Sequence, residues 1–279
     1  MTARSTPTAA VPTAADRRNT AVSVRGLELG AGRPQIIVPL VGADDDALRA
    51  QAIATCASPA RILEWRVDCF APQADAAEHR ERVLAMLPQL RAQMGEERAL
   101  LVTVRTAAEG GQRELPDGEL SALLCALIEA STAQDEALVD LVDIETARGA
   151  ETVAQVIAAA HARHIPVVGS FHDFHATPPL GEITRILREQ RRRGADIPKI
   201  AVTPRSPEEV LTLLAASSEI AADGEGPHIA ISMGTLGAVS RVAAETFGSA
   251  ATFAQVGEAS APGQLDVADV ARMLELLRP

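Results

Sequence analysis

Short apolar runs recur along the chain, and helix-like stretches separate them. Buried strands that alternate with helices of ten or more residues are typical of βαβ units and of a parallel sheet. The pattern therefore predicts an α/β fold with eight strand–helix units. The eight predicted strands, most of them rich in β-branched residues, are Gln35–Val41, Ile62–Asp68, Ala99–Arg105, Leu138–Ile144, Ile165–Phe171, Asp196–Val202, His228–Met233 and Ala250–Val256.

The stretches between the strands carry ordinary helix signals. Most of them begin with acidic residues, which suit the positive end of a helix dipole. Pro88 lies inside the second stretch and predicts a kink or an early end there. The clearest predicted helices are Asp44–Cys56, Asp75–Met94, Asp117–Ala130, Glu208–Ser217 and Asp266–Leu277.

Eight units without a long linker favour one closed (β/α)8 barrel, a TIM barrel, over a doubly wound open sheet. An open sheet usually has a glycine-rich first turn, and no GxGxxG fingerprint follows the first strand here. Ala21–Pro34 alternates apolar and polar residues and contains glycine turns, so we expect a β-hairpin that closes the N-terminal mouth of the barrel.

The first twenty residues differ from the remainder of the chain. Residues 1–20 are rich in Ala, Thr and Pro, and no apolar segment follows Arg17 and Arg18. The segment therefore does not have the pattern of a secretion signal, and we expect a disordered extension. Residues 21–279 are then expected to form a single barrel domain.

Composition and charge narrow the range of partners. The formal net charge is −11 and the pI is about 5.1, which argues against a nucleic-acid or anionic-membrane surface. No run approaches the ~18 apolar residues of a membrane span. Cys56, Cys69 and Cys125 are scattered, without a CxxC motif or a histidine at metal-ligand spacing. They predict reduced thiols, a cytoplasmic protein and no metal site.

One basic residue has an unusual identity. Of the 26 Lys and Arg residues, 25 are Arg, and the single lysine is Lys199. Arginine stays protonated in proteins, whereas lysine can lose its proton and attack a carbonyl group. Lys199 lies in a predicted buried strand, where desolvation disfavours its charged form. We interpret Lys199 as a nucleophile; the alternative is a structural ion pair with Asp196 or with a barrel carboxylate.

Functional groups in (β/α)8 barrels collect at the C-terminal ends of the strands. His172 follows the fifth predicted strand, next to the strand that carries Lys199, and is therefore the candidate general acid and base. His175 lies in the same loop but farther from the strand end, so it is the weaker candidate.

Charged residues from several strands point to the same end of the barrel. Glu64 and Arg66 are two residues apart and share one face of the second strand, whereas Trp65 between them faces the helices. Arg105 ends the third strand, and Arg241 follows the seventh. Three arginines that converge in an acidic protein indicate an anionic substrate, because the guanidinium group suits a carboxylate.

Seven segments together resemble the type I 3-dehydroquinate dehydratase family, from about Ile36 to Leu277. The resemblance implies a (β/α)8 barrel, usually a homodimer, that converts 3-dehydroquinate to 3-dehydroshikimate in the shikimate pathway without a metal or cofactor. The segments, in the order of the family, are ILEWRVD, VTVRTAAEGG, GSFHDFHATP, ADIPKIAV, SMGTLGAVSR, FGSAATF and ASAPGQ.

The resemblance also implies roles for individual residues. Lys199 is expected to form the Schiff base, His172 to act as the general acid and base, and Glu109 to orient His172. The implied substrate-binding residues are Glu64, Arg66, Arg105, Arg241, Ser260 and Gln264.

Departures from the family pattern are small. Pro39 stands where some members have Ser, so a hydroxyl contact is absent there. Pro198 precedes the lysine, and because proline lacks a ladder donor we expect a local bulge at Lys199. Neither departure removes a catalytic group.

Two other functions agree with part of the pattern. A class I aldolase also forms a lysine imine in a barrel, but phosphosugar aldolases generally hold phosphate with the loops after strands seven and eight. Here those loops offer an Arg, a Ser and a Gln, which suit a carboxylate and hydroxyl groups. A binding or regulatory barrel without catalysis is disfavoured by the complete set of Glu109, His172 and Lys199.

Overall fold

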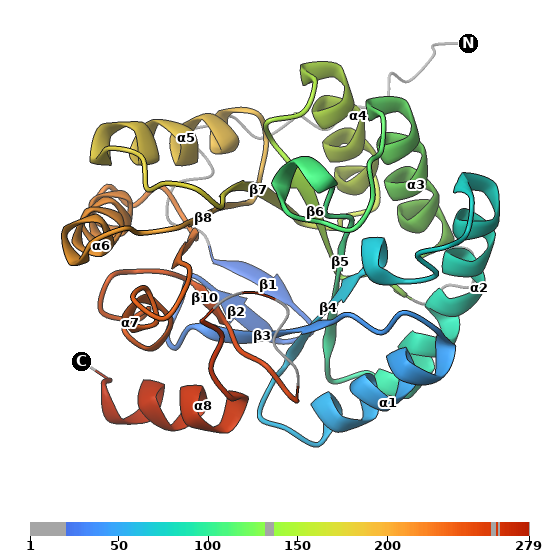
Figure 1. The fold of residues 1–279 in the computed structure, drawn as a ribbon, viewed down its shortest axis with the longest axis horizontal. Coiled ribbons are helices and arrows are strands. Elements are labelled where there is room, and N and C mark those ends of the chain that lie inside the picture. Colours follow the sequence, from blue (N-terminus) through green and yellow to red (C-terminus); the bar gives the residue numbers. More distant parts are fainter. Residues whose placement is uncertain (1–20, 132–136, 258–260, 262, 279) are drawn as a thin grey trace, which may run out of the picture.

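The computed structural model describes residues 21–131, 137–257, 261 and 263–278. Eight parallel strands form a ring, and helices surround it (Figure 1). The predicted extension, residues 1–20, lies outside the described residues. All eight predicted strands are confirmed, with shifted ends, as β3 (Gln35–Leu40), β4 (Ile62–Arg66), β5 (Ala99–Thr103), β6 (Leu141–Glu145), β7 (Val167–Asp173), β8 (Ile197–Val202), β9 (Ile229–Ser232) and β10 (Ala251–Phe253).

The strands follow one another around the ring in chain order, from β3 to β10, and β10 pairs with β3. Hydrogen bonds at the starts of β9 and β10 link the two ends of the sheet order. The backbone N–H of Ala250 donates to the carbonyl of His228 at 2.7 Å, and the Ser249 hydroxyl accepts from the N–H of Ala230 at 3.1 Å. The predicted (β/α)8 barrel is therefore confirmed.

Helices cover the outer face of the ring, as the alternating pattern predicted. Asp44, Asp75 and Asp266 cap three of them by accepting hydrogen bonds from backbone N–H groups of the first turn. Pro88 lies inside α2 and does not end it. The helices are α1 (Asp45–Cys56), α2 (Ala76–Met94), α3 (Asp117–Ala130), α4 (Ala150–His161), α5 (Leu180–Arg192), α6 (Pro207–Ala222), α7 (Val239–Val242) and α8 (Val267–Leu276).

Side chains alternate between the helix layer and the barrel interior along every strand, as the period of two requires. Trp65 lies in the helix layer and contacts Phe70 edge to face, with ring centroids 5.7 Å apart, so its predicted packing role is confirmed. The interior at the N-terminal ends of the strands is filled by apolar residues, which are Ile37, Ile62, Leu101, Leu141, Val168, Ile197 and Ile229.

A hairpin of β1 (Val22–Val24) and β2 (Leu27–Leu29) precedes the barrel. Arg25 and Gly26 both have positive φ, as a tight two-residue turn requires. Val24, Leu27 and Leu29 are buried against the apolar residues of the barrel interior. The predicted closure of the N-terminal mouth is therefore confirmed, and access is left to the opposite end.

The expected bulge at Lys199 is wrong. The pairing of β7 with β8 runs without interruption from Val168 opposite Ile197 to Asp173 opposite Val202. Pro198 lies near the start of β8, where a missing backbone donor disturbs the ladder least. Lys199 therefore occupies a regular strand position.

Among the described residues, no helix combines the length and the apolar character needed to cross a membrane.

Candidate active site

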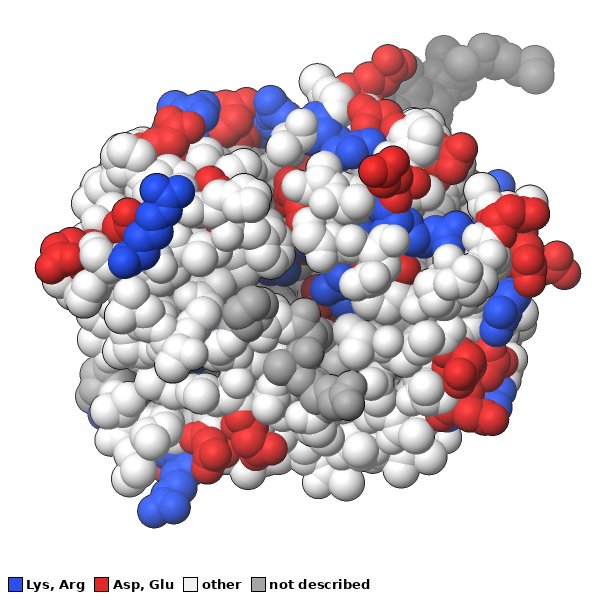
Figure 2. All heavy atoms as spheres, viewed as in Figure 1, with Lys and Arg blue, Asp and Glu red and all other residues white. Residues whose placement is uncertain are grey.

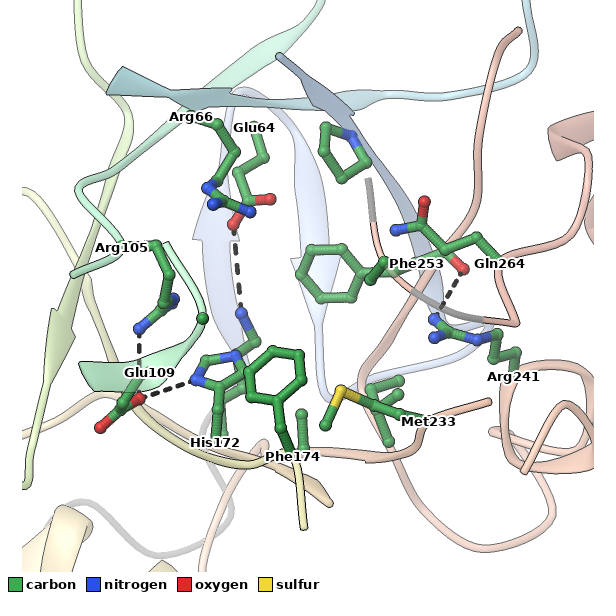
Figure 3. A pocket seen from close by; sticks show the side chains of 16 residues that line it. Glu64, Arg66, Arg105, Glu109, His172, Phe174, Met233, Arg241, Phe253 and Gln264 are labelled. Carbon is green, nitrogen blue, oxygen red and sulfur yellow. Dashed lines mark hydrogen bonds and ion pairs between the residues drawn. The ribbon is translucent and has the colours of Figure 1, made fainter. Parts of the chain in front are cut away.

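A pocket opens at the C-terminal ends of the strands, opposite the hairpin (Figure 3). Its polar side chains come from β4, β7, β8 and the loops that follow the strands, which is where barrel enzymes place their chemistry. Eight of the nine residues predicted from the sequence line it. The lining residues are Pro39, Glu64, Arg66, Arg105, Glu109, Gly110, His172, Phe174, Lys199, Ala201, Ile231, Met233, Arg241, Phe253, Ala261 and Gln264.

Lys199 projects from β8 into this pocket, with 5% of its side chain exposed. Its Nζ lies 3.5 Å from Asp143 Oδ2, 4.0 Å from Glu64 Oε1 and 4.5 Å from the centre of the Phe253 ring. Lys199 therefore does contact barrel carboxylates, one of the two ion-pair alternatives that the sequence left open. Asp196 instead accepts hydrogen bonds from the His161 ring and from the N–H of Val167.

Burial sets the protonation of this amine. Desolvation lowers the pKa of Lys199, and the positive charges of Arg105 and Arg66 lower it further. Asp143 and Glu64 oppose this effect, but the net pKa lies below the ordinary value. A larger fraction of the amine is thus neutral, and only the neutral amine can attack a carbonyl carbon.

His172 lies on β7, the strand that pairs with β8. Its Nδ1 is 2.8 Å from Glu109 Oε2, and Glu109 follows β5 in the short 3-10 helix Ala107–Glu109 (Figure 3). This contact fixes the orientation of the ring and directs Nε2 away from Glu109. The Phe174 ring stacks beside the imidazole, with the centroids 6.4 Å apart. The structure thus brings together Glu109, His172 and Lys199, which are far apart in the sequence.

The two members of the Glu109–His172 pair both favour their uncharged forms. Burial raises the pKa of Glu109 to about 8, against the opposing effect of Arg105. Burial, together with the charges of Arg105, Lys199 and Arg66, holds the pKa of His172 well below its usual value. The neutral imidazole is the form that can accept a proton, and its contact with Glu109 is available to stabilise the imidazolium that results.

Arg105 is held at the base of the pocket by buried carboxylates. Its guanidinium group donates to Asp143 at 2.9 Å, to Glu145 at 3.1 Å and to Glu109 at 3.4 Å, and also to the Ser170 hydroxyl at 3.0 Å. Such a network offsets much of the cost of removing the guanidinium charge from water. Arg105 thus lines the pocket as predicted, but most of its donors are already occupied by the protein.

Arg66 and Arg241 differ in their surroundings. Arg66 forms a two-pronged ion pair with Asp68, at 2.8 and 2.7 Å. Arg241 donates to the carbonyl of Phe253 at 3.2 Å, and burial lowers its pKa to about 10. Gln264 lies beside Arg241 on the same side of the pocket (Figure 3). The remaining predicted residue, Ser260, lies outside the described residues.

The sequence analysis did not identify the carboxylates of β6. Asp143 and Glu145 are buried, and together they contact Lys199, Arg105 and the hydroxyl of Thr106. The available signal was the pair of acidic residues two positions apart in an otherwise apolar strand, because such residues share one face. Within the described residues, no group of three or more Asp, Glu, His or Cys side chains could hold a metal ion.

The surface around the pocket carries charges of both signs. On the face shown in Figure 2, acidic and basic side chains are interspersed along the upper and right sides, and basic side chains are visible in a central hollow. The net negative charge of the chain therefore coexists with basic side chains in the pocket, as expected for an anionic substrate.

The fold and the pocket together define a class: a (β/α)8 barrel with a buried lysine beside a histidine–carboxylate pair, the arrangement of an imine-forming lyase. The model of the type I 3-dehydroquinase family matches residues 36–279. The chain belongs to this family.

Relatives and solved structures agree with the assignment. The chain is 43% identical to the 3-dehydroquinate dehydratase of Escherichia coli O9:H4, over 92% of this chain and 98% of the relative. The structure of 3-dehydroquinate dehydratase from Geobacillus kaustophilus is similar with a TM-score of 0.85 and 38% identity, over 94% and 97% of the two chains. The type I enzyme from Clostridium difficile, described with covalently modified comenic acid, also has a TM-score of 0.85, at 34% identity over 93% and 98%.

Proposed function

We propose that this chain is a 3-dehydroquinate dehydratase, a hydro-lyase that forms 3-dehydroshikimate through a Schiff base on Lys199. The observation that carries the proposal is the buried Lys199 amine, with a lowered pKa, in one pocket with the His172–Glu109 pair. Membership of the family supports the same reaction.

The first step is attack of the neutral Lys199 amine on the C3 ketone of the substrate. Loss of water from the resulting carbinolamine gives a protonated imine. An unperturbed lysine with a pKa of ~10.4 would be only about one part in a thousand neutral at pH ~7.4, so the lowered pKa of Lys199 favours this step. Asp143 and Glu64, which lie within 4.0 Å of Nζ, can stabilise the iminium charge that forms.

The second step removes the C2 proton. His172 Nε2 accepts this proton while the C–H electrons enter the imine system and give an enamine. The imidazolium is stabilised by Glu109, whose Oε2 contacts Nδ1. His172 then returns the proton to the C1 hydroxyl, which leaves as water. Hydrolysis of the remaining imine releases 3-dehydroshikimate and restores the amine.

Substrate binding is assigned to the cationic and polar groups at the mouth. Arg241 and Gln264 lie beside one another there and suit a carboxylate with adjacent hydroxyl groups. Glu64, Arg66 and Arg105 border the opposite part of the pocket. Ser260 belongs to the same assignment through the family resemblance. These groups fit a polyhydroxylated acid better than a phosphorylated sugar, so they favour the dehydratase over a class I aldolase.

We also propose that residues 21–279 act as one domain, and that the protein works as a homodimer in the cytoplasm on this small-molecule substrate in the shikimate pathway. The family resemblance and three unpaired cysteines support this setting. Light scattering of the purified chain measures the oligomeric state directly, and a monomer at assay concentration would contradict the dimer.

Borohydride trapping tests the reaction. Sodium borohydride added during turnover reduces the imine to a stable secondary amine, and the adduct should be found on the peptide that contains Lys199. Because the chain has one lysine, the only other amine is the N-terminus, which lies on a separate peptide. Lys199→Met is the control and should give neither adduct nor the absorbance of the conjugated product. An active wild-type chain with an unmodified Lys199 peptide would exclude the imine mechanism.

A further inference from the structure

A buried glutamine outside the barrel contacts the backbone of the candidate nucleophile. Gln190 lies near the end of α5, the helix between β7 and β8, and 1% of the residue is exposed. Its side-chain Oε1 accepts from the backbone N–H of Lys199 at 3.0 Å, and its Nε2 donates to the backbone carbonyl of Lys199 at 3.0 Å. One amide group thus binds both backbone polar groups of the residue whose side chain enters the pocket.

The same amide connects β8 to the two preceding strands. Gln190 Nε2 also donates to the hydroxyl of Thr146, at 3.2 Å, immediately after β6. The Thr146 hydroxyl and backbone N–H both donate to the carbonyl of Ser170 on β7, at 3.0 and 2.8 Å. The Ser170 side chain points the other way, into the barrel, and donates to Asp143 at 2.7 Å. Gln190 therefore joins the strands that carry Asp143, His172 and Lys199.

The local sequence leaves space for this contact. A Cβ atom added at Gly169 of β7 would lie 2.6 Å from Ala195 Cβ and 3.1 Å from Thr146 Cγ2, and Gln190 Cβ is 3.7 Å away. Glycine at this position therefore leaves room for Ala195 and Thr146, the residue that accepts from Gln190, while Gln190 itself is at ordinary contact distance. A buried amide without partners would destabilise the fold, whereas here three hydrogen bonds satisfy it.

We propose that Gln190 is a positioning residue. From the helix layer it fixes the backbone of Lys199, so that the amine reaches the substrate ketone and the resulting imine places its C2 proton within reach of His172. This inference rests on the proposed function. Gln190 itself is not among the residues that line the pocket, so it acts on the reaction only through Lys199 and the strands beside it.

Gln190→Met tests the proposal, because methionine keeps the length and unbranched shape of glutamine but removes the three hydrogen bonds. We expect kcat to fall by about 10-fold to 100-fold, the effect of displacing a reacting group by a fraction of an ångström to one ångström. KM should remain within about threefold, because the groups assigned to substrate binding lie on other elements. The rate of borohydride trapping at Lys199 should fall with kcat.

Arg191→Leu is the matched control from the same helical turn. The Arg191 side chain donates to the carbonyls of Asp196 and Pro227, at 2.8 and 2.6 Å, just before β8 and β9 begin. Its loss should lower the melting temperature, as Gln190→Met does, but leave kcat within about twofold. A folded Gln190→Met protein with wild-type kcat and trapping rate would overturn the proposal, as would an equal loss of kcat in Arg191→Leu.

Thr146→Val provides a milder test if Gln190→Met does not fold. It removes the hydroxyl that accepts from Gln190 and preserves the side-chain volume, so we expect about a threefold loss of kcat with little change in KM. Wild-type kcat in this variant would reject the inference. Borohydride trapping in the wild-type chain separates this inference from the proposed function. If the wild-type chain gives no Lys199 adduct, the imine mechanism is wrong, whatever the role of Gln190.

Discussion

At the N-terminal end of the barrel the inward side chains are apolar, whereas at the C-terminal end of the same strands they are charged. On β6, Leu141 lies in the apolar layer above the hairpin, and Asp143 and Glu145 follow it toward the pocket. On β8, Ile197 is followed by Lys199 in the same way. One step of two residues along a strand separates the two environments.

The difference shows how the fold tolerates a charged interior. Apolar burial stabilises by about 25 cal/mol per Å², and the sealed N-terminal end supplies much of it. Removing charges from water is unfavourable unless partners compensate, and Arg105 has three carboxylates around it. The N-terminal end should therefore govern stability and the C-terminal end activity, a separation that mutation can test.

The largest expected effect is on the active-site end. His172→Ala removes the candidate base, and kcat should fall by about 10²–10⁴-fold. Imine formation needs only the Lys199 amine, so borohydride should still trap substrate on Lys199. His175→Ala, an exposed residue in the same loop, is the matched control and should retain wild-type kcat. Steady-state assays of product absorbance make the measurement, and wild-type turnover in His172→Ala would remove this residue from the mechanism.

The hairpin should show the opposite behaviour. Leu29 is 1% exposed and packs into the apolar layer, so Leu29→Ala should lower the free energy of unfolding by about 2–5 kcal/mol through lost burial and a cavity. The kcat of the folded variant should stay within about twofold of wild type. Urea denaturation and assays at low temperature measure both quantities.

Glu28→Ala, at an exposed position of the same strand, is the control for Leu29→Ala. It should change neither the free energy of unfolding nor kcat appreciably. If kcat falls in Leu29→Ala in proportion to stability, the two ends of the barrel do not behave independently.

His228 makes the N-terminal end sensitive to acid. It is fully buried, contacts the Ser217 hydroxyl at 2.8 Å, and burial lowers its pKa to about 4. Below pH ~6.5 the unfolded chain binds a proton that the folded imidazole does not bind until pH about 4. The free energy of unfolding therefore includes the full contribution of this group above pH ~6.5. As the pH falls from ~6.5 to about 4, that free energy decreases by roughly 3 kcal/mol.

Urea denaturation at several pH values checks the effect of His228. His228→Asn should be less stable at neutral pH but should lack this part of the pH dependence. A wild-type and a variant curve that run parallel between pH ~6.5 and ~4 would show that His228 titrates normally in the folded state.

The smallest expected effect concerns the pH dependence of activity. The negative charge of Asp143 raises the pKa of Lys199, so Asp143→Asn should lower that pKa further. In a plot of kcat/KM against pH, the rising limb should then move to lower pH by about one unit. Asp140→Asn is the control, because Asp140 lies just before the same strand but pairs with Arg25 and Arg91 away from the pocket. An unmoved limb in Asp143→Asn would mean that Asp143 does not tune the amine.

Much of the site could be predicted because its residues are unusual in sequence. Lys199 is the single lysine, and His172 directly follows a strand predicted from the sequence. The contribution of Asp143 was not predicted, because an acidic residue in an apolar run can face either side of a strand. Only the closed sheet places Asp143 inside the barrel, with its Oδ2 3.5 Å from Lys199 Nζ on β8.

For the arginines too, only part of the arrangement could be predicted from the sequence. Their convergence on one end of the barrel follows from the positions of the strand ends, but their partners do not. Arg105 is engaged with Asp143, Glu145 and Glu109, whereas Arg66 is paired with Asp68. Which cation remains available to a substrate carboxylate depends on distances between strands that are far apart in the chain.

The sequence by itself determined the alternation of strands and helices, the eight-unit barrel, the hairpin and the choice of Lys199 and His172 as the candidate nucleophile and base. These follow from local periodicity and from residue types with distinctive chemistry. The tertiary structure decided which carboxylates surround Lys199, how the pKa values of Lys199, His172 and Glu109 shift, and that Gln190 binds the lysine backbone from the helix layer. The physical reason is that desolvation and charge interactions depend on distances in space, which only closure of the barrel sets.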